Sequence, residues 1–177
     1  MTIILILFII LIIAILIMYN NLVKARIKVK QAEAGIDVYL KQRFDLIPNL
    51  VETVKAYSKH EQEIFTEVAN LRNAYMNGQN GIKDGANLNN KINKLVAIAE
   101  QYPDLKANEQ YLNLQKALSK VENQLQAARR IYNSEVTEYN QKLETVPSNL
   151  VAGLFGFKHE NLFEIEEYEK ENVNIKV

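Results

Sequence analysis

The dipeptide His60-Glu61 is the feature of this sequence that comes closest to a catalytic motif. In the HExxH zinc motif, two histidines four positions apart share one face of a helix and hold the metal. Position 64 is Ile in this chain, and His159 is the only other histidine. The chain has no cysteine, so a zinc site would need three carboxylate or distant ligands. We therefore predict no metal site and no cofactor.

Other catalytic arrangements are also missing. Neither histidine lies in a strand-turn-helix context that would present a serine nucleophile. An Asn-rich stretch contains Gly78, Gly81 and Gly85, but no Lys-Ser/Thr follows it, so it does not resemble a phosphate-binding loop. The carboxylates of Glu61 and Glu63 are two residues apart and point to different faces of a helix. We expect no enzyme activity and no small-molecule substrate.

Six polar residues interrupt the apolar stripes of the predicted helices, and they are the candidates for structural or binding roles. Asp37 and Arg43 can pair with partners across a bundle, and the others can cap or cross-link helices. Polar groups in such positions can fix helix register or form a binding surface, and we favour the structural role. The six are Asp37, Arg43, Asp45, Asn49, Arg129 and Asn133.

The elements that position these residues begin with an apolar N-terminal helix. Met1 to Val23 carries no charged side chain, and about 20 helical residues cross a hydrocarbon core about 30 Å thick. A cleaved signal peptide is the competing interpretation. The apolar run is longer than the roughly 7 to 15 residues of such peptides, and it lacks a preceding charge and an Ala-x-Ala site. We predict an uncleaved, single-pass transmembrane anchor over residues 1–23 of a cell-membrane protein.

Four cations follow this span, with no acidic residue before Glu33. By the positive-inside rule they place the C-terminal bundle in the cytoplasm and the N-terminus outside. The same cations could contact anionic lipid, but we favour a role in topology alone. We call Lys24, Arg26, Lys28 and Lys30 the basic collar, and we add Tyr19, at the headgroup layer, to complete the candidate membrane-interface residues.

The apolar rhythm continues past the span from Leu22 to Tyr39, in steps that alternate between 3 and 4 residues. The anchor helix should therefore run without a break into the soluble domain. Gly35 weakens this helix by about 1 kcal/mol relative to Ala but does not stop it. A boundary is expected near Asp45 to Pro48, because Pro fits a first helical turn and Asp45 is a plausible N-cap. We expect either a new helix or a sharp kink there.

A second predicted helix carries an apolar stripe from Ile47 to Tyr75, interrupted by Glu61. We interpret Glu61 as an edge or register residue rather than a functional buried acid. Residues 77–87 are rich in Gly and Asn and predict a loop. A third helix is predicted from Leu88 to Tyr102, where Pro103 interrupts it.

The longest predicted helix runs from about Asn108 to Val146 and is ended by Pro147. Its stripe advances by 3.5 residues on average, which is typical of coiled-coil packing. A helix this long must be covered by the other helices laid antiparallel. The fold class is therefore all-α, with one N-terminal transmembrane helix that continues into a long antiparallel bundle of three to four helices over residues 24–147. The stripe comprises Tyr111, Leu114, Leu118, Val121, Leu125, Ala128, Tyr132, Val136, Tyr139, Leu143 and Val146.

Residues 148–177 hold an apolar cluster and then a Glu-rich tail from Glu160 to Glu171. The cluster can fold back onto the bundle or dip into lipid, and the sequence leaves both open. The tail is expected to be partly disordered and solvated. The 21 basic and 21 acidic residues cancel, so we expect no nucleic-acid partner. The cluster is Leu150, Val151, Leu154, Phe155 and Phe157.

Taken in order, these motifs resemble those of the LemA family of bacterial membrane proteins. The resemblance implies a membrane helix followed by a long antiparallel helical bundle, and it supplies no activity. The chain departs from the family pattern at Gln42 and Phe44, where basic or polar residues are common. The matching segments include Tyr19–Val23, Ile36–Val38, Leu40–Arg43, Asp45–Val51, Tyr102–Asn108, Pro147–Asn149 and Leu154–Phe157.

Three functions are compatible with these features. The leading hypothesis is a membrane-tethered interaction or scaffold protein that binds another membrane protein or itself, because long apolar stripes favour association between helices. The alternative is a lipid-contacting, membrane-remodelling protein in which the basic collar and the cluster from Leu150 to Phe157 both touch lipid. The third, an enzyme, would need a pocket that the sequence does not indicate.

Overall fold

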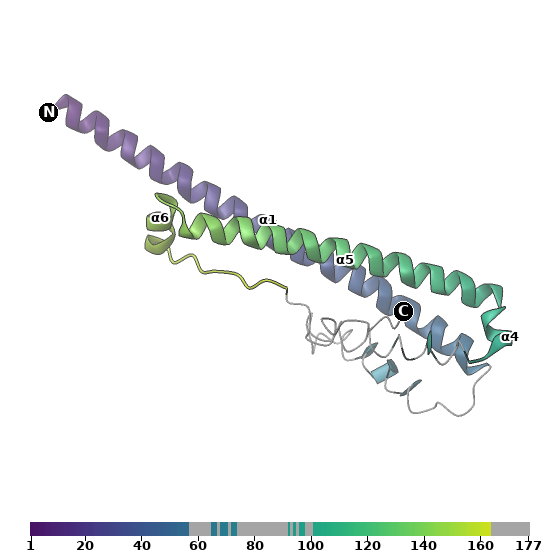
Figure 1. Ribbon diagram of the computed structural model, residues 1–177. Coiled ribbons are helices and arrows are strands. Elements are labelled where there is room, and N and C mark those ends of the chain that lie inside the picture. The colour runs from purple at the N-terminus through teal and green to yellow at the C-terminus, as the bar shows by residue number, and fades with distance from the viewer. Residues whose placement is uncertain are drawn as a thin grey trace, which may run out of the picture. The chain divides into compact units, whose positions relative to one another are not determined.

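The structure, a computed structural model, describes residues 1–56, 65, 66, 68–70, 72, 73, 92, 94, 96, 97 and 101–163. The bounded elements in these ranges are all helices, which confirms the all-α class. Most of the predicted second and third helices, the loop at 77–87 and the tail after residue 163 lie outside the described residues. The helices are α1 (Thr2–Lys55), α4 (Pro103–Lys106), α5 (Glu109–Glu144) and α6 (Ser148–Leu154) (Figure 1).

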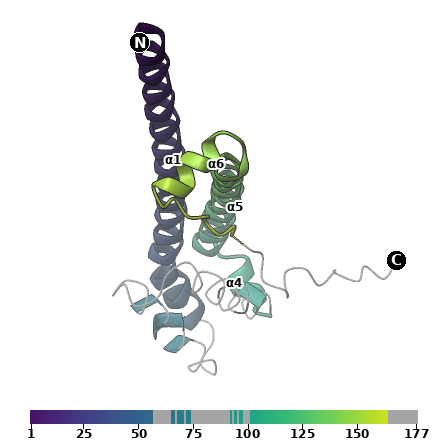
Figure 2. The same ribbon diagram turned by 90° about the vertical axis from the view of Figure 1, so that its left-hand side faces the viewer.

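The chain divides into two compact units. Unit 1 comprises Met1–Ile36 and Ala127–Ile165, and unit 2 is built around Asp37–Gln126. Within each unit α5 runs antiparallel to α1 (Figures 1 and 2). The division into anchor, bundle and tail at residues 23 and 147 stays a prediction.

The predicted continuity of the anchor helix is confirmed, because α1 is one helix of 54 residues. Leu22, Val29 and Ile36 are at most 3% exposed, so the apolar stripe that begins at the end of the span becomes the core of unit 1. Gly35 lies inside the helix, as expected. Its cost of about 1 kcal/mol is smaller than the roughly 1.5 to 3 kcal/mol gained by burying one large apolar side chain.

Of the two alternatives predicted at Asp45 to Pro48, the new helix is wrong, and the sharp kink stays a prediction. α1 continues to Lys55 with Pro48 inside it, and Asp45 is an exposed helical residue rather than an N-cap. An interior proline costs about 3 kcal/mol, because it lacks a backbone donor and crowds the carbonyl four residues earlier. Phe44 and Leu50 are fully buried on either side of Pro48, and each contributes about 1.5 to 3 kcal/mol. Packing therefore outweighs the local preference.

The predicted bounds of the longest helix are confirmed to within two residues, because α5 spans Glu109–Glu144. Asn108 begins it: its side-chain oxygen accepts the backbone N–H of Gln110 at 2.8 Å and that of Tyr111 at 3.2 Å. Such a cap satisfies donors that the first turn leaves without partners. The predicted stripe is buried as far as Leu143. Its last member, Val146, is 78% exposed, because the helix has already ended.

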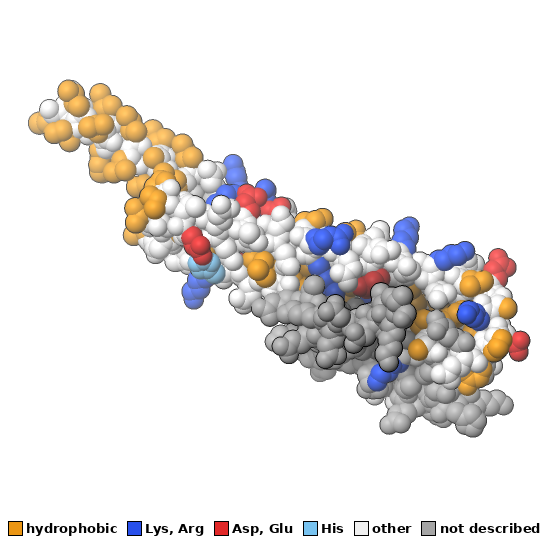
Figure 3. Space-filling view, in the orientation of Figure 1, with side chains coloured by type: hydrophobic (Ala, Val, Ile, Leu, Met, Phe, Trp, Pro, Cys, Tyr) orange, Lys and Arg blue, Asp and Glu red, His pale blue; other side chains and the backbone are white. Residues whose placement is uncertain are grey.

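The N-terminal stretch of α1 has no neighbouring element in unit 1 (Figures 1 and 2). It is long and apolar enough to cross a membrane, and no part of its most apolar window is buried. In the space-filling view, hydrophobic side chains cover this stretch (Figure 3). A helix of this length and composition with no protein around it is suited to a hydrocarbon environment. The chain is accordingly a membrane-associated protein.

Unit 2 has its own apolar core. Leu105 in the short helix α4 is fully buried, which fixes the turn that leads into α5. The other large buried residues of α1 and α5 in this unit include Leu40, Phe44, Ile47, Leu50, Val54, Tyr111, Leu118 and Leu125.

Candidate functional site

Four side chains of α5 in unit 1 hold the extended segment that follows α6. They are two Tyr-Asn pairs, Tyr132-Asn133 and Tyr139-Asn140, spaced seven residues apart. Because seven residues make almost two helical turns, the pairs lie on the same face of α5. We call these four residues the Tyr–Asn ladder, and residues 158–163 the held segment.

The two tyrosines of the ladder donate their hydroxyl hydrogens to backbone carbonyls. The hydroxyl of Tyr139 donates to the carbonyl oxygen of Lys158, and that of Tyr132 to the carbonyl oxygen of Asn161, each at 3.0 Å. The tyrosine rings are buried in the core of unit 1, as the apolar stripe predicted. Each ring therefore contributes to the core, while its hydroxyl reaches the edge.

The two asparagines each make a pair of hydrogen bonds with one backbone residue. The side-chain nitrogen of Asn140 donates to the carbonyl of Glu160 at 2.8 Å, and its oxygen accepts the N–H of Glu160 at 3.0 Å. Asn133 does the same with Phe163, at 3.0 and 2.7 Å. Each amide thus replaces the partner that a neighbouring strand would supply to an extended backbone.

The spacing of the ladder matches the rise of the held segment. Seven residues of α-helix rise about 10.5 Å. Three residues of extended chain rise about 10 Å. The tyrosines reach residues 158 and 161, and the asparagines reach 160 and 163, so both steps along the segment are three residues. All six bonds go to the backbone, and the side chains of Lys158, His159 and Leu162 are exposed.

Burial raises the pKa of both tyrosine hydroxyls above the ordinary value. For Tyr132, desolvation is the main cause, and the negative charges of Glu33 and Glu160 add to it. For Tyr139, desolvation again dominates, while Arg26 partly lowers the pKa and Glu160 raises it. Both hydroxyls therefore keep the proton that they donate to the held segment throughout the physiological range.

Two of the six predicted polar residues converge on the end of the held segment. The guanidinium of Arg129 lies 4.5 Å from the ring centre of Phe163, in a cation–π contact, while Asn133 binds the backbone of the same residue. Arg129 is 7% exposed, so its charge is largely removed from solvent. The aromatic ring and the amide together fix the position of Phe163 against α5.

The other four polar candidates belong to unit 2 and lie on α1. Arg43 is 4% exposed and forms an ion pair with Glu122 of α5, which also accepts a hydrogen bond from Gln126 at 2.8 Å. This pair joins the two helices across unit 2. The remaining three, which are exposed, are Asp37, Asp45 and Asn49.

Two of the five candidate membrane-interface residues, Tyr19 and Arg26, contact the chain at the end of α6. The ring of Tyr19 lies 4.8 Å from that of Phe155 and 5.7 Å from that of Phe157. The guanidinium of Arg26 lies 5.2 Å from the ring centre of Phe157. The apolar cluster is therefore joined to α1 where the span ends.

Members of the basic collar differ in whether they form ion pairs within the protein. Lys28 lies 3.9 Å from both Glu135 and Glu138 on α5. Glu138 also accepts a hydrogen bond from Lys142 at 2.5 Å, and its pKa is lowered by that bond, then by the charges of Lys142 and Lys28. The other two collar lysines, Lys24 and Lys30, are exposed and form no ion pair with a described residue.

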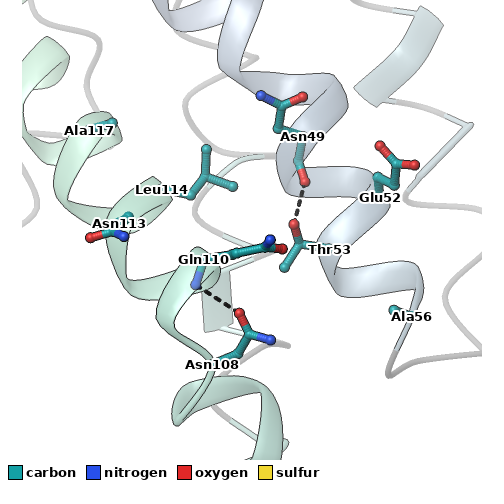
Figure 4. Close-up of a pocket in the computed structure, with 9 residues that line it drawn as sticks. All are labelled: Asn49, Glu52, Thr53, Ala56, Asn108, Gln110, Asn113, Leu114 and Ala117. Atoms are coloured by element: carbon teal, nitrogen blue, oxygen red, sulfur yellow. Dashed lines mark hydrogen bonds between the residues drawn. The ribbon is translucent and has the colours of Figure 1, made fainter.

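Unit 2 contains an open pocket of about 740 Å³ between the end of α1 and the start of α5 (Figure 4). Glu52 is the only titratable side chain among its lining residues. The hydroxyl of Thr53 donates to the carbonyl of Asn49 at 2.6 Å, and the side-chain oxygen of Asn108 caps α5, so both are already engaged. The lining residues therefore provide no pair of acid and base that could catalyse a reaction.

No group of three or more potential metal ligands occurs within the part of the chain that the structure describes. His60, Glu61 and Glu63 lie outside it, and the absence of a metal or an activity stays a prediction. The apolar stripe predicted a core position for Tyr132 and Tyr139, and Asn140 is not among the six polar candidates. The repeat of Tyr-Asn at a spacing of seven was the available signal.

The chain is similar in sequence to known proteins. A model of the LemA family matches residues 32–177, which leaves the apolar span and Tyr19 outside the match. Protein LemA of Metamycoplasma hominis is 26% identical over an alignment of 159 residues, which covers 88% of this chain and 73% of that protein.

Two magnetosome proteins are more distant relatives. Magnetosome protein MamQ 2 of Paramagnetospirillum magneticum is 23% identical over 175 aligned residues, and magnetosome protein MamQ of Magnetospirillum gryphiswaldense is 22% identical over 174. Each alignment covers 82% of this chain and 64% of the relative. The chain therefore spans less than two thirds of the length of these magnetosome proteins.

Proposed function

The chain belongs to the LemA family, and from that premise we propose that it is a membrane-tethered interaction or scaffold protein. Its partner is another membrane protein or a second copy of itself. The partner binds the surface formed by α5 and the held segment in unit 1. No catalytic step is part of this proposal.

The observation that supports it most directly is the Tyr–Asn ladder. Six hydrogen bonds hold the segment by its backbone, so the ladder leaves the side chains of that segment available. Leu162 is 50% exposed, and Lys158 and His159 are exposed beside it. A segment ordered in advance loses less conformational entropy when a partner binds to its side chains. The arrangement thus favours presentation of a short recognition surface.

The experiment is site-specific photocrosslinking in cells that express the full-length protein. A photoreactive amino acid replaces Leu162, both in the native chain and in the double variant Asn133→Ala/Asn140→Ala. We expect an adduct of defined mass at position 162 that is lost in the double variant. A matched probe replaces Leu112, which is 38% exposed in unit 2, and its adducts should not change.

The outcomes separate the proposed partners. An adduct of twice the mass of the chain, which carries both tags when two differently tagged copies are expressed, indicates self-association. A heavier adduct with one tag indicates another protein. Adducts with lipid alone would favour the membrane-remodelling alternative. The absence of any protein adduct at position 162, or an adduct unaffected by the double variant, would rule out the proposed surface.

We also propose that the bundle lies in the cytoplasm and the N-terminus outside, because the basic collar follows the span. The chain has no cysteine, so single cysteines can be labelled with a membrane-impermeant thiol reagent. Asn113→Cys, at an exposed position on α5, should be protected in intact cells and labelled after permeabilisation. Thr2→Cys should be labelled in intact cells. The reverse pattern would place the bundle outside.

A further inference from the structure

The apolar cluster after α5 is divided between an inward and an outward side. Val151 and Ala152 in α6 are buried, at 6% and 3% exposure. Leu150 and Leu154 are 71% and 76% exposed, and Phe155, next along the chain, is 52% exposed. Because Leu150 and Leu154 are four residues apart, they share one face of α6. Leu150 and Leu154 therefore form one outward apolar face, and the half-exposed ring of Phe155 follows it directly in the chain.

The position of this surface along α1 is set by the aromatic contacts. The ring of Tyr19 packs against those of Phe155 and Phe157, and Arg26 lies over Phe157. From Thr2 to Tyr19, α1 rises roughly 26 Å, so a hydrocarbon core about 30 Å thick ends within about three residues of Tyr19. The outward surface of α6 thus lies at the level where α1 leaves the hydrocarbon.

The composition and the backbone of residues 146–157 are compatible with a position at the edge of the hydrocarbon core. Residues 146–157 contain no charged side chain. Gly156 has a φ of +68°, and the N–H of Phe157 bonds to the carbonyl of Ala152 at 3.0 Å, which closes the end of α6. A glycine is favoured at this turn because other residues are strained at positive φ. Both rings beside this turn contact Tyr19, but Phe155 stays 52% exposed, whereas Phe157 is half-buried and also contacts Arg26.

We propose that α6 and Phe155 form a second membrane contact, in which Leu150, Leu154 and Phe155 enter the lipid beside the point where α1 leaves the bilayer. We call these three residues the apolar foot. The occupant of this surface is the bilayer that already surrounds α1, since the foot continues the exposed apolar surface of the span (Figure 3). Amphipathic elements of this kind insert about 5 to 10 Å into the boundary between headgroups and acyl chains.

The consequence is that unit 1 is attached to the membrane at two places. A single transmembrane helix can rotate about its axis and tilt. A foot held against Tyr19 removes part of that freedom, so unit 1 keeps one face toward the bilayer. This inference goes beyond the proposed function, because it requires the anchor but no protein partner.

The test uses the full-length protein in vesicles of phosphatidylcholine and phosphatidylglycerol. The chain has no tryptophan, so Leu154→Trp provides a single fluorescent reporter. The matched control is Ile131→Trp, which is 57% exposed in the same unit. Glu135, one helical turn from Ile131, has a carboxylate oxygen 3.9 Å from the Nζ of Lys28. Lys28 lies about 14 Å further along α1 than Tyr19, so Ile131 is well away from the proposed lipid level. Brominated phosphatidylcholine quenches indoles that touch its acyl chains.

We expect the emission of Leu154→Trp to be shifted to the blue and quenched by brominated lipid, more strongly when the bromine lies near the glycerol end of the chain than near the methyl end. The emission of Ile131→Trp should remain that of a hydrated indole and should resist quenching. Hydrated emission from Leu154→Trp would overturn the proposal. Blue-shifted emission that brominated lipid does not quench would also overturn it, because protein, such as a second copy, would then cover the foot. The crosslinking result at Leu162 is independent of either outcome.

Discussion

Removal of the Asn133 side-chain amide tests whether the Tyr–Asn ladder holds the segment after α6. Asn133→Ala deletes two hydrogen bonds to the backbone of Phe163, of 3.0 and 2.7 Å. Each such bond contributes a net 0.5 to 1.5 kcal/mol, so the loss is about 2 kcal/mol. Asn140→Ala removes two more bonds from Glu160. Because the two sites are about 10 Å apart on α5, the effects should nearly add, to about 4 kcal/mol.

Hydrogen exchange reports this loss directly, because the amides of Glu160 and Phe163 are themselves donors to the ladder. A free energy of about 1.4 kcal/mol corresponds to a factor of ten in an opening equilibrium. Protection of Phe163 should therefore fall about 30-fold in the single variant. We expect the segment to lose its remaining protection in the double variant. The measurement is mass spectrometry of the full-length protein in lipid nanodiscs, with peptides that cover residues 158–163.

Asn113→Ala is the matched control, because it is the same substitution at an exposed position of the same helix in unit 2. It should leave residues 158–163 unchanged. If the amides of Glu160 and Phe163 exchange in the double variant as they do in the native chain, the ladder does not hold the segment. If the amides of α5 lose protection to the same extent, the substitutions have unfolded unit 1, and the reasoning about a local release is wrong.

Three further predictions concern the rest of the molecule. Arg43→Ala should lower the free energy of unfolding by about 3 kcal/mol, because it leaves Glu122 without its ion-pair partner. In the same denaturant titration, the double variant Arg43→Met/Glu122→Leu should lose less stability, because neither charge remains. Equal losses in the two variants would contradict this account. Pro48→Ala should stabilise the protein by about 1 to 3 kcal/mol, because Pro48 is exposed inside α1 and lacks the backbone N–H that a helix interior uses. An unchanged or lower melting temperature would show that the proline suits its position. The raised pKa values of Tyr132 and Tyr139 mean that the contribution of their hydroxyls to stability is complete below the unfolded pKa of about 10 and is lost as the pH rises through the folded values. In an ultraviolet titration of phenolate, Tyr132→Phe/Tyr139→Phe should therefore remove a component that ionises at higher pH than an ordinary tyrosine, and removal of an ordinary component would refute the assignment.

The sequence was sufficient to predict the long helices, because their signals are local. The uncharged stretch before Lys24 indicates the span, and the alternating steps of 3 and 4 indicate helices that bury one face. Asn108 is a recognisable cap, so the start of α5 was predicted to within one residue. The prediction of a new helix at Pro48 failed, because local preference and tertiary burial oppose each other there. The burial of Phe44 and Leu50 stabilises the continuous helix by more than the proline destabilises it.

The sequence by itself thus determined the long apolar N-terminal helix, the all-α class and the buried stripes, since those depend on hydrophobicity and periodicity along one chain. Only the tertiary structure decided which polar residues meet. Arg129 and Asn133 converge on Phe163, which is at least 30 residues away in the chain. Asn133 binds the backbone of Phe163, and a backbone contact does not depend on the type of residue, so the sequence does not reveal it. It also decided that Val151 faces inward while Leu150 and Leu154 face outward, because this depends on where the chain turns at Gly156 and meets Tyr19. Hydrophobicity indicates that a residue avoids water, but it does not indicate whether protein or lipid will replace the water.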